Sequence, residues 1–126
     1  MRPCEALRDA LQHDLVDESK LIVHHYPQQL HKFIKLYGVS SLACAAKHGH
    51  IDIVKFLASL PIIDVNVADN CSRTPIFWAA QYGHLNAVRF LASLPNTKVN
   101  ATDRHGWTPM HCAARFGHVD VVRFLA

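Results

Sequence analysis

The sequence lacks most of the features that assign a chain to an enzyme class or to a membrane. It contains no G-x-S-x-G, no P-loop and no G-x-G-x-x-G motif. Its cysteines form no C-x-x-C pair, and no apolar run reaches the roughly 18 residues that a membrane-spanning helix needs. The first residues contain no apolar stretch of the kind found in a signal peptide. We therefore expect no enzyme activity, no cofactor, no membrane span and an intracellular, cytoplasmic location, with export as a host-directed effector left open.

The modest net charge conceals an uneven distribution. The whole chain has a formal net charge of +3. Residues 1–18 contain five acids and two arginines, a net of −3, so that residues 19–126 carry the remaining 11 basic residues and five acids, a net of +6. A basic body of this kind suits a protein partner with an acidic surface, or an acidic peptide.

What the sequence does contain is a repeat of 34 residues. Ala-Ala pairs begin at positions 45, 79 and 113, Gly-His pairs at 49, 83 and 117, and Phe-Leu-Ala triplets at 56, 90 and 124. A fixed period of this size is typical of stacked supersecondary units, each unable to bury its apolar face alone. Such a stack offers a long lateral surface rather than a closed pocket, and surfaces of this kind usually bind other proteins.

The clearest unit begins at position 103, and each part of it has a recognisable structural role. Gly106 lies in a turn where positive φ is needed. Thr108 is a favourable N-cap, and Pro109 follows at the first helical position. Gly117 then ends this short helix, and a second helix begins near Val119. The unit is therefore predicted to be a turn followed by a pair of helices.

The segment Thr-Pro-Met-His-Cys-Ala at 108–113 resembles the T-P-L-H-x-A signature of ankyrin repeats, with methionine in place of leucine. The resemblance covers roughly residues 36–126 and implies an all-α, ankyrin-like helix-turn-helix solenoid. Two features depart from the family pattern. The period is 34 residues rather than about 33, and the signature histidine survives only as His111, because Ala43 and Phe77 replace it in the other units.

The period also sets the predicted boundaries. Residues 1–37 form a degenerate N-terminal capping repeat, residues 38–71 and 72–105 form two ankyrin-like repeats, and residues 106–126 form a third that is incomplete at its end. Apolar spacing predicts two helices in the first segment, which could instead be a separate docking helix. The last helix would expose an apolar side, which indicates a piece of a longer protein or pairing through an uncapped C-terminal end.

In ankyrin-like stacks, the turn tips and the exposed side of the first helices form a concave face. The resemblance implies that this face binds the partner. The implied contact positions are Tyr37, Val39, Lys47, His48, Asn70, Arg73, Gln81, Tyr82, Arg104, His105, Trp107, Arg115 and Phe116. This set contains four aromatic residues, three arginines, one lysine and no acid, and aromatic residues and arginine are enriched at protein interfaces. Trp107 beside Arg73 and Arg104 could bind a carboxylate or a phosphate together with an apolar group; the alternative is that the set consists of solvated turn residues and helix-packing aromatics.

Ten histidines invite a metal-site hypothesis, but their spacing argues against it. His50, His84 and His118 recur once per unit, and adjacent units lie on the order of 10 Å apart, too far to share an ion bound at about 2.1 Å. We expect these histidines to bond backbone groups near the corner between helices, and we predict no metal site. Cys44 and His48 could share a helix face, but two ligands make a weak site. The cysteines at 4, 44, 71 and 112 are expected to stay reduced.

The sequence thus predicts a non-enzymatic protein–protein interaction module, acting as an adaptor, a scaffold or an inhibitor through a basic, aromatic concave face. Two alternatives stay open. Trp, Tyr and Arg side chains also stack on bases, so binding of nucleic acid or another polyanion is the second hypothesis, although the positive charge is modest. A spacer domain of a larger protein is the third.

Overall fold

Every regular element in the described part of the chain is a helix. The computed structural model describes residues 6, 8, 10, 11, 13, 14, 16–25, 41–60 and 63–126. The helices are α2 (Val16–His25), α4 (Ile51–Ser59), α5 (Pro75–Gln81), α6 (Leu85–Ser93), α7 (Pro109–Arg115) and α8 (Val119–Leu125), and residues 41–48 are also helical. The predicted all-α solenoid is confirmed.

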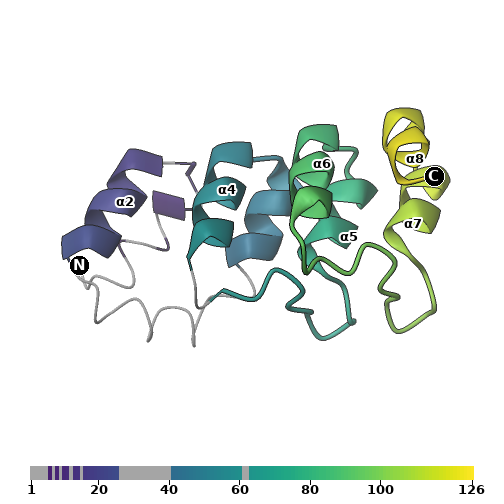
Figure 1. Cartoon of the computed structure of the whole chain (residues 1–126), viewed down its shortest axis with the longest axis horizontal. Helices are drawn as coiled ribbons and strands as arrows, with labels where there is room; N and C mark the ends of the chain where they lie inside the picture. Colours follow the sequence, from purple (N-terminus) through teal and green to yellow (C-terminus); the bar gives the residue numbers. More distant parts are fainter. Residues whose placement is uncertain are drawn as a thin grey trace.

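The helices form two rows. Figure 1 shows the helix pairs standing side by side along the chain, with the loops that link one unit to the next on one side. In the first row α5 packs against α7, and in the second α4 packs against α6 and α6 against α8. Each unit is closed by contacts within its own pair, α5 with α6 and α7 with α8. Successive turns and first helices therefore come to lie on one continuous face.

A single apolar core runs between the rows and is built from equivalent positions in successive units. The second helices supply Ile53, Val54 and Leu57 from α4, Ala87, Val88 and Leu91 from α6, and Val121 from α8. The first helices supply small residues, and the pair Ala79 and Ala80 is fully buried. Because alanine adds little bulk, the first helices can approach one another closely, and this brings the turn of each unit against the preceding one.

The predicted helix signals are in place. Thr74 and Thr108 are the N-caps of α5 and α7, and in each helix a proline follows at the first turn. The Thr108 hydroxyl accepts a hydrogen bond from the backbone N–H of His111, and the N–H of Thr108 donates to the His111 ring, which completes a capping box. Gly106 and Gly117 have φ values of +80° and +78°, as the turn and the helix end require.

A histidine in each of two units links that unit to the one before it. His84 Nε2 lies 2.9 Å from the carbonyl oxygen of Lys47, and His118 Nε2 lies 2.8 Å from that of Gln81. A carbonyl oxygen can only accept, so Nε2 donates in both bonds. Each ring lies over a glycine of the preceding unit, Gly49 or Gly83. The predicted structural role of these two histidines is confirmed.

The loops at the opposite side of the stack are linked by an asparagine. Asn66 donates from Nδ2 to the carbonyl of Asn96 at 2.7 Å, and its Oδ1 accepts from the N–H of Lys98 at 2.8 Å. These partners belong to the corresponding loop of the next unit. The histidine and asparagine bonds therefore fix adjacent units at two separate places.

The last helix leaves apolar side chains in contact with solvent. Val119 is 58% exposed and Phe124 is 40% exposed, and Phe116, at the end of the preceding helix, is 53% exposed. This agrees with the exposed apolar side that the sequence predicts for the final unit.

Replacing Gly83 by alanine should cost more stability than replacing Gly117. Both residues have positive φ, so each substitution introduces backbone strain of about 1–2 kcal/mol. At Gly83 the new Cβ would lie 2.5 Å from Nδ1 of His118, whereas nothing lies within 4 Å of the position at Gly117. We expect Gly83→Ala to lower the free energy of unfolding by a further 1–3 kcal/mol or so, as overpacking typically does, when both variants are unfolded in urea.

The double variant Gly83→Ala/His118→Ala is the control for this comparison. Once the ring is absent, the additional cost of the alanine should disappear, and this non-additivity would measure the contact between the two residues. Equal losses of stability at Gly83 and Gly117 would show that the ring does not constrain the glycine.

Candidate functional site

Counted from the aspartate that opens each turn, the second unit begins at Asp69 and the third at Asp103. The candidate site begins with the turn of the third unit, which the buried carboxylate of Asp103 organises. Asp103 Oδ1 accepts hydrogen bonds from the backbone N–H groups of His105 and Trp107, both at 2.9 Å. The backbone N–H of Asp103 donates to the carbonyl of Trp107, also at 2.9 Å. Gly106 supplies the positive φ that closes the turn. The turn thereby holds Trp107 at the edge of the face formed by the first helices.

The turn of the second unit is held by the same kind of backbone hydrogen bonds, but the second oxygen of its carboxylate has a different partner. Asp69 Oδ1 accepts from two backbone N–H groups, as Asp103 does. Asp69 Oδ2 accepts from the indole Nε1 of Trp78 at 3.1 Å. One period later the position of Trp78 is occupied by Cys112, so no indole is available to Asp103. Instead, Asp103 Oδ2 lies 3.9 Å from Nε of Arg73, which belongs to the preceding unit.

Asp103 is held in its charged form although it is buried. Burial by itself raises the pKa of this carboxyl, but the backbone hydrogen bonds from Trp107 and His105 and the electrostatic influence of the His105 and Arg73 side chains lower it more. The net result is a pKa below the usual value for aspartate. The site therefore contains a fixed negative charge at neutral pH, next to the Arg73 guanidinium.

Arg73 is positioned by aromatic rings as well as by this carboxylate. Its guanidinium carbon lies 5.1 Å from the ring centre of Trp78 and 5.7 Å from that of Phe77. Its Nε is buried, with no hydrogen-bond partner among the described residues. Arg73 is therefore held mainly by ring faces and by the charge of Asp103.

Arg115 makes a second set of ring contacts at the end of α7. Its guanidinium carbon lies 4.9 Å from the ring centre of Trp107 and 6.0 Å from that of Phe116. Arg115 is exposed, and within the described part of the chain its side chain has no ion pair or hydrogen bond. A stacked guanidinium keeps its N–H edge available, so Arg115 presents several donors to solvent.

Lys47 extends the pattern to the first unit. Its ammonium lies 5.5 Å from the ring centre of Trp78 and 5.6 Å from that of Tyr82, and these two rings are themselves stacked 6.3 Å apart. Positive side chains from three successive units therefore lie against aromatic rings on the same face.

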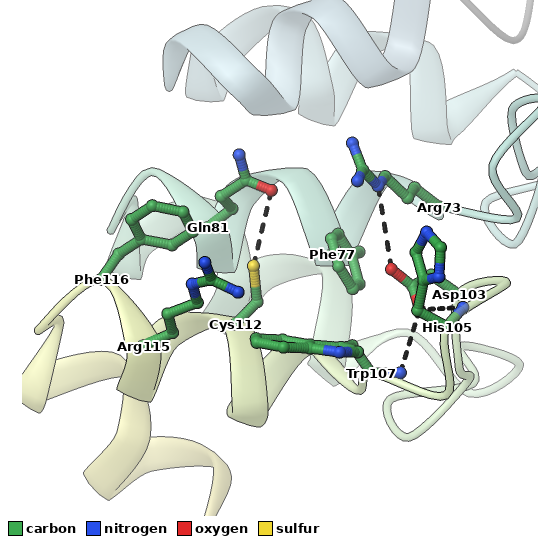
Figure 2. Close-up of a pocket in the computed structure, with 9 residues that line it drawn as sticks. All are labelled: Arg73, Phe77, Gln81, Asp103, His105, Trp107, Cys112, Arg115 and Phe116. Atoms are coloured by element: carbon green, nitrogen blue, oxygen red, sulfur yellow. Dashed lines mark hydrogen bonds and ion pairs between the residues drawn. The ribbon is translucent and has the colours of Figure 1, made fainter.

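Arg73, Arg115 and the turn around Asp103 border an open pocket of about 360 Å³ between the second and third units (Figure 2). Its lining residues are Arg73, Phe77, Gln81, Asp103, His105, Trp107, Cys112, Arg115 and Phe116. Figure 2 shows Arg115 and Arg73 at opposite ends of the pocket, with Cys112 and Phe77 between them. The pocket has an apolar middle and one arginine at each end.

The thiol in the pocket is not poised for nucleophilic chemistry. Cys112 is buried, and its Sγ donates to Oε1 of Gln81 at 3.4 Å. Burial raises the pKa of this thiol, and the charge of Asp103 adds to the rise, whereas Arg73 and Arg115 oppose it. The protonated sulfur contributes mainly an apolar surface to the pocket.

Six of the thirteen predicted contact positions line this pocket. Two more belong to the neighbouring cluster formed by Lys47, Trp78 and Tyr82. The six are Arg73, Gln81, His105, Trp107, Arg115 and Phe116. Lys47 and Tyr82 lie against Trp78. Asn70 and Arg104 are exposed and do not line the pocket, and the His48 ring stacks on His50 at 5.8 Å. Tyr37 and Val39 lie outside the described residues.

Sequence reasoning missed Phe77, Trp78, Asp103 and Cys112. Phe77 replaces the histidine of the repeat signature, and Trp78 and Cys112 occupy the same position one period apart. A position that repeats in the backbone but changes from a large to a small side chain is a signal of a local hollow. Asp103 was visible as the first residue of a turn, but its second role as the counter-ion of Arg73 depends on the contact between units.

The family model for ankyrin repeats, which describes three copies, matches residues 42–126. The match covers more than half of the chain, and the chain belongs to the ankyrin repeat family. The resemblance seen in the sequence is therefore confirmed. No match was found among curated proteins.

Two further findings concern only the residues that the structure describes. None of the helices there is long and apolar enough to cross a membrane. No group of three or more His, Cys, Asp or Glu side chains gathers there to hold a metal ion.

Replacing Asp103 by asparagine should lower the melting temperature in a pH-dependent manner. Because the pKa of Asp103 is lower in the folded chain, its charge stabilises the fold above the unfolded pKa of about 3.9. This stabilisation is lost as the pH falls through the folded pKa. The difference in melting temperature between the wild type and Asp103→Asn should therefore be largest near neutral pH and shrink below about pH 4.

Thermal unfolding followed by circular dichroism at several pH values measures this difference. Asp52→Asn, which removes an exposed acid from the first turn of α4, is the matched control for loss of a carboxylate. A difference that stays constant from pH 7 to pH 3 would show that the charge of Asp103 is not what stabilises the turn.

Proposed function

We propose that this chain is a recognition module that binds a protein partner through its pocket face. We define this face as the turns of the second and third units together with α5 and α7 and the helical residues 41–48. Ankyrin repeats are generally protein–protein interaction modules, and the chain belongs to that family. The module serves as an adaptor, a scaffold or an inhibitor, with no catalytic step of its own.

The observation that supports this most is the run of ring-stacked positive side chains on the pocket face. Lys47, Arg73 and Arg115 each lie within 6.0 Å of at least one ring centre. Stacking restricts the rotamers of these long side chains before any partner arrives, which lowers the entropy lost on binding. Tryptophan, tyrosine and arginine supply most of the energetic hot spots in measured interfaces.

The chemistry of the pocket favours binding over catalysis. The buried thiol of Cys112 has a raised pKa, and one oxygen of the Asp103 carboxylate is occupied by two backbone N–H groups. A general base needs a free oxygen or nitrogen aimed at its substrate. The Asp103 carboxylate is instead engaged in shaping the turn and in balancing the charge of Arg73.

Binding of nucleic acid or another polyanion is the second candidate, and a different surface favours it. Lys55 lies over the ring of Phe90 at 5.9 Å, and Arg89 lies over the ring of Phe124 at 5.7 Å. These exposed bases recur along the second helices, in the row opposite to the pocket face. A polyanion following this row would show steep salt dependence and would not need Trp107.

Trp107→Ala should weaken binding of the protein partner by about 1–3 kcal/mol, because a half-buried tryptophan that lines the pocket has the properties of a hot spot. Proteins captured from lysate by the wild type would be identified, and the affinity of the purified partner would be measured by calorimetry for each variant. Circular dichroism would establish that each variant is folded.

Arg89→Ala is the matched control, because it removes a ring-stacked arginine from the opposite row. It should leave the affinity of the protein partner unchanged. A partner that binds Trp107→Ala as well as the wild type, but loses affinity for Arg89→Ala, would move recognition to the row of second helices. A partner insensitive to both changes would direct attention to the exposed apolar end at α8.

A further inference from the structure

The two arginines of the pocket differ in whether a counter-ion is already present. Arg73 has Asp103 Oδ2 at 3.9 Å, and this carboxylate is kept ionised by its hydrogen bonds and by neighbouring charge. Arg115 faces no acid within the described part of the chain, where its side-chain contacts are the rings of Trp107 and Phe116. The pocket therefore has one neutralised end and one end with an uncompensated positive charge.

This difference determines where an incoming carboxylate can bind. A carboxylate placed on Arg73 would approach the charge of Asp103, and two ionised carboxylates in one site repel each other. A carboxylate placed on Arg115 meets a guanidinium that ring contacts have already oriented. Planar guanidinium groups bind carboxylates through two parallel hydrogen bonds. The geometry thus favours one acidic group, at the Arg115 end.

The middle of the pocket is suited to an apolar group. Phe77 is 2% exposed and Cys112 is 3% exposed, and both contribute surface to the pocket. The half-buried ring of Trp107 faces the same space (Figure 2). An aliphatic or aromatic side chain placed here would exclude water from Trp107 and would strengthen the adjacent ion pair by lowering the local dielectric constant.

We propose that the pocket recognises a protein segment in which one acidic side chain lies beside an apolar side chain. The carboxylate binds Arg115, and the apolar group lies against Phe77, Cys112 and Trp107. This inference rests on the proposed recognition function and narrows it from an acidic partner in general to a singly acidic, locally apolar segment. A phosphorylated side chain, with its greater charge, is disfavoured by Asp103 in the same pocket.

The test uses a random library of 12-residue peptides displayed on phage, selected in parallel on three forms of the whole chain. These are the wild type, Arg115→Gln and Arg89→Gln. Glutamine preserves most of the side-chain length and removes the charge. Arg89 is the matched control, because it is an exposed, ring-stacked arginine on α6, in the row opposite to the pocket face.

The wild type and Arg89→Gln should both enrich peptides with one Asp or Glu at a fixed spacing from an aromatic or aliphatic residue. Arg115→Gln should keep the apolar preference and lose the acidic one. For a synthetic peptide of the enriched sequence, changing its acid to the amide should weaken binding to the wild type about tenfold, measured by fluorescence anisotropy. The same change should have no effect on binding to Arg115→Gln, as expected when two groups interact directly.

Several outcomes would overturn the inference. An acidic preference that persists in Arg115→Gln or disappears in Arg89→Gln would place the contact elsewhere. Tighter binding of a phosphoserine peptide than of the acidic peptide would contradict the role given to Asp103. A library with no enriched sequence would also count against it.

Binding of the selected peptides to a fourth form, Trp107→Ala, separates this inference from the broader proposal. If the peptides bind independently of Arg115 but lose affinity for Trp107→Ala, the acidic specificity is wrong and the pocket face is still the recognition surface. If they bind Trp107→Ala and Arg115→Gln as tightly as the wild type, both the acidic specificity and the pocket face as recognition surface are wrong.

Discussion

The registration of one unit on the next is the constraint on which the rest of the structure depends. At one side of the stack, the histidine that opens the second helix donates to a carbonyl of the preceding unit, as His118 does to Gln81. At the other side, Asn66 bonds the loop of the following unit through both ends of its amide. Two points of attachment fix both separation and rotation, so the turn of one unit must face the first helix of the unit before it. Gln81 connects this registration to the pocket, because its backbone oxygen accepts from His118 while its side chain accepts from Cys112.

Electrostatics in the pocket follow from this registration. Asp103 is placed by its own turn, yet its second oxygen lies near Arg73 because the two units are held in a fixed relation. The acid is buried, and burial alone would favour its neutral form. Two backbone N–H donors and the neighbouring positive charges reverse that preference. The lining of the pocket therefore combines positive groups with one internal negative charge, that of Asp103, rather than being uniformly basic. Such a surface discriminates by the position of charge in the ligand as well as by its sign.

Much of the fold could be predicted from the sequence, because it depends on groups that act locally. The caps at Thr74 and Thr108 need only the first turn of their own helices, and the turn glycines need only their own φ. The site was predicted in part, since the period indicates which positions share a face. The pairing of Arg115 with Trp107 was not predicted, because it depends on how the turn directs the indole toward the end of α7. The link from Asp103 to Arg73 was missed because it joins residues in different units. A repeating pattern indicates equivalent backbone positions, whereas contacts between units depend on the side chains that do not repeat.

The pocket itself can be traced to one such position. In the second unit, the indole of Trp78 fills the space behind the turn and bonds the carboxylate of Asp69. One period later Cys112 is too small to do either, although the turn around Asp103 keeps the same two backbone hydrogen bonds. The space that an indole would occupy is left open, and the free oxygen of the carboxylate is left to Arg73. The change from tryptophan to cysteine thus converts a filled structural turn into a hollow with polar ends, and the backbone of the repeat is preserved. A stack of near-identical units can in this way acquire a distinct binding pocket without any change in its fold.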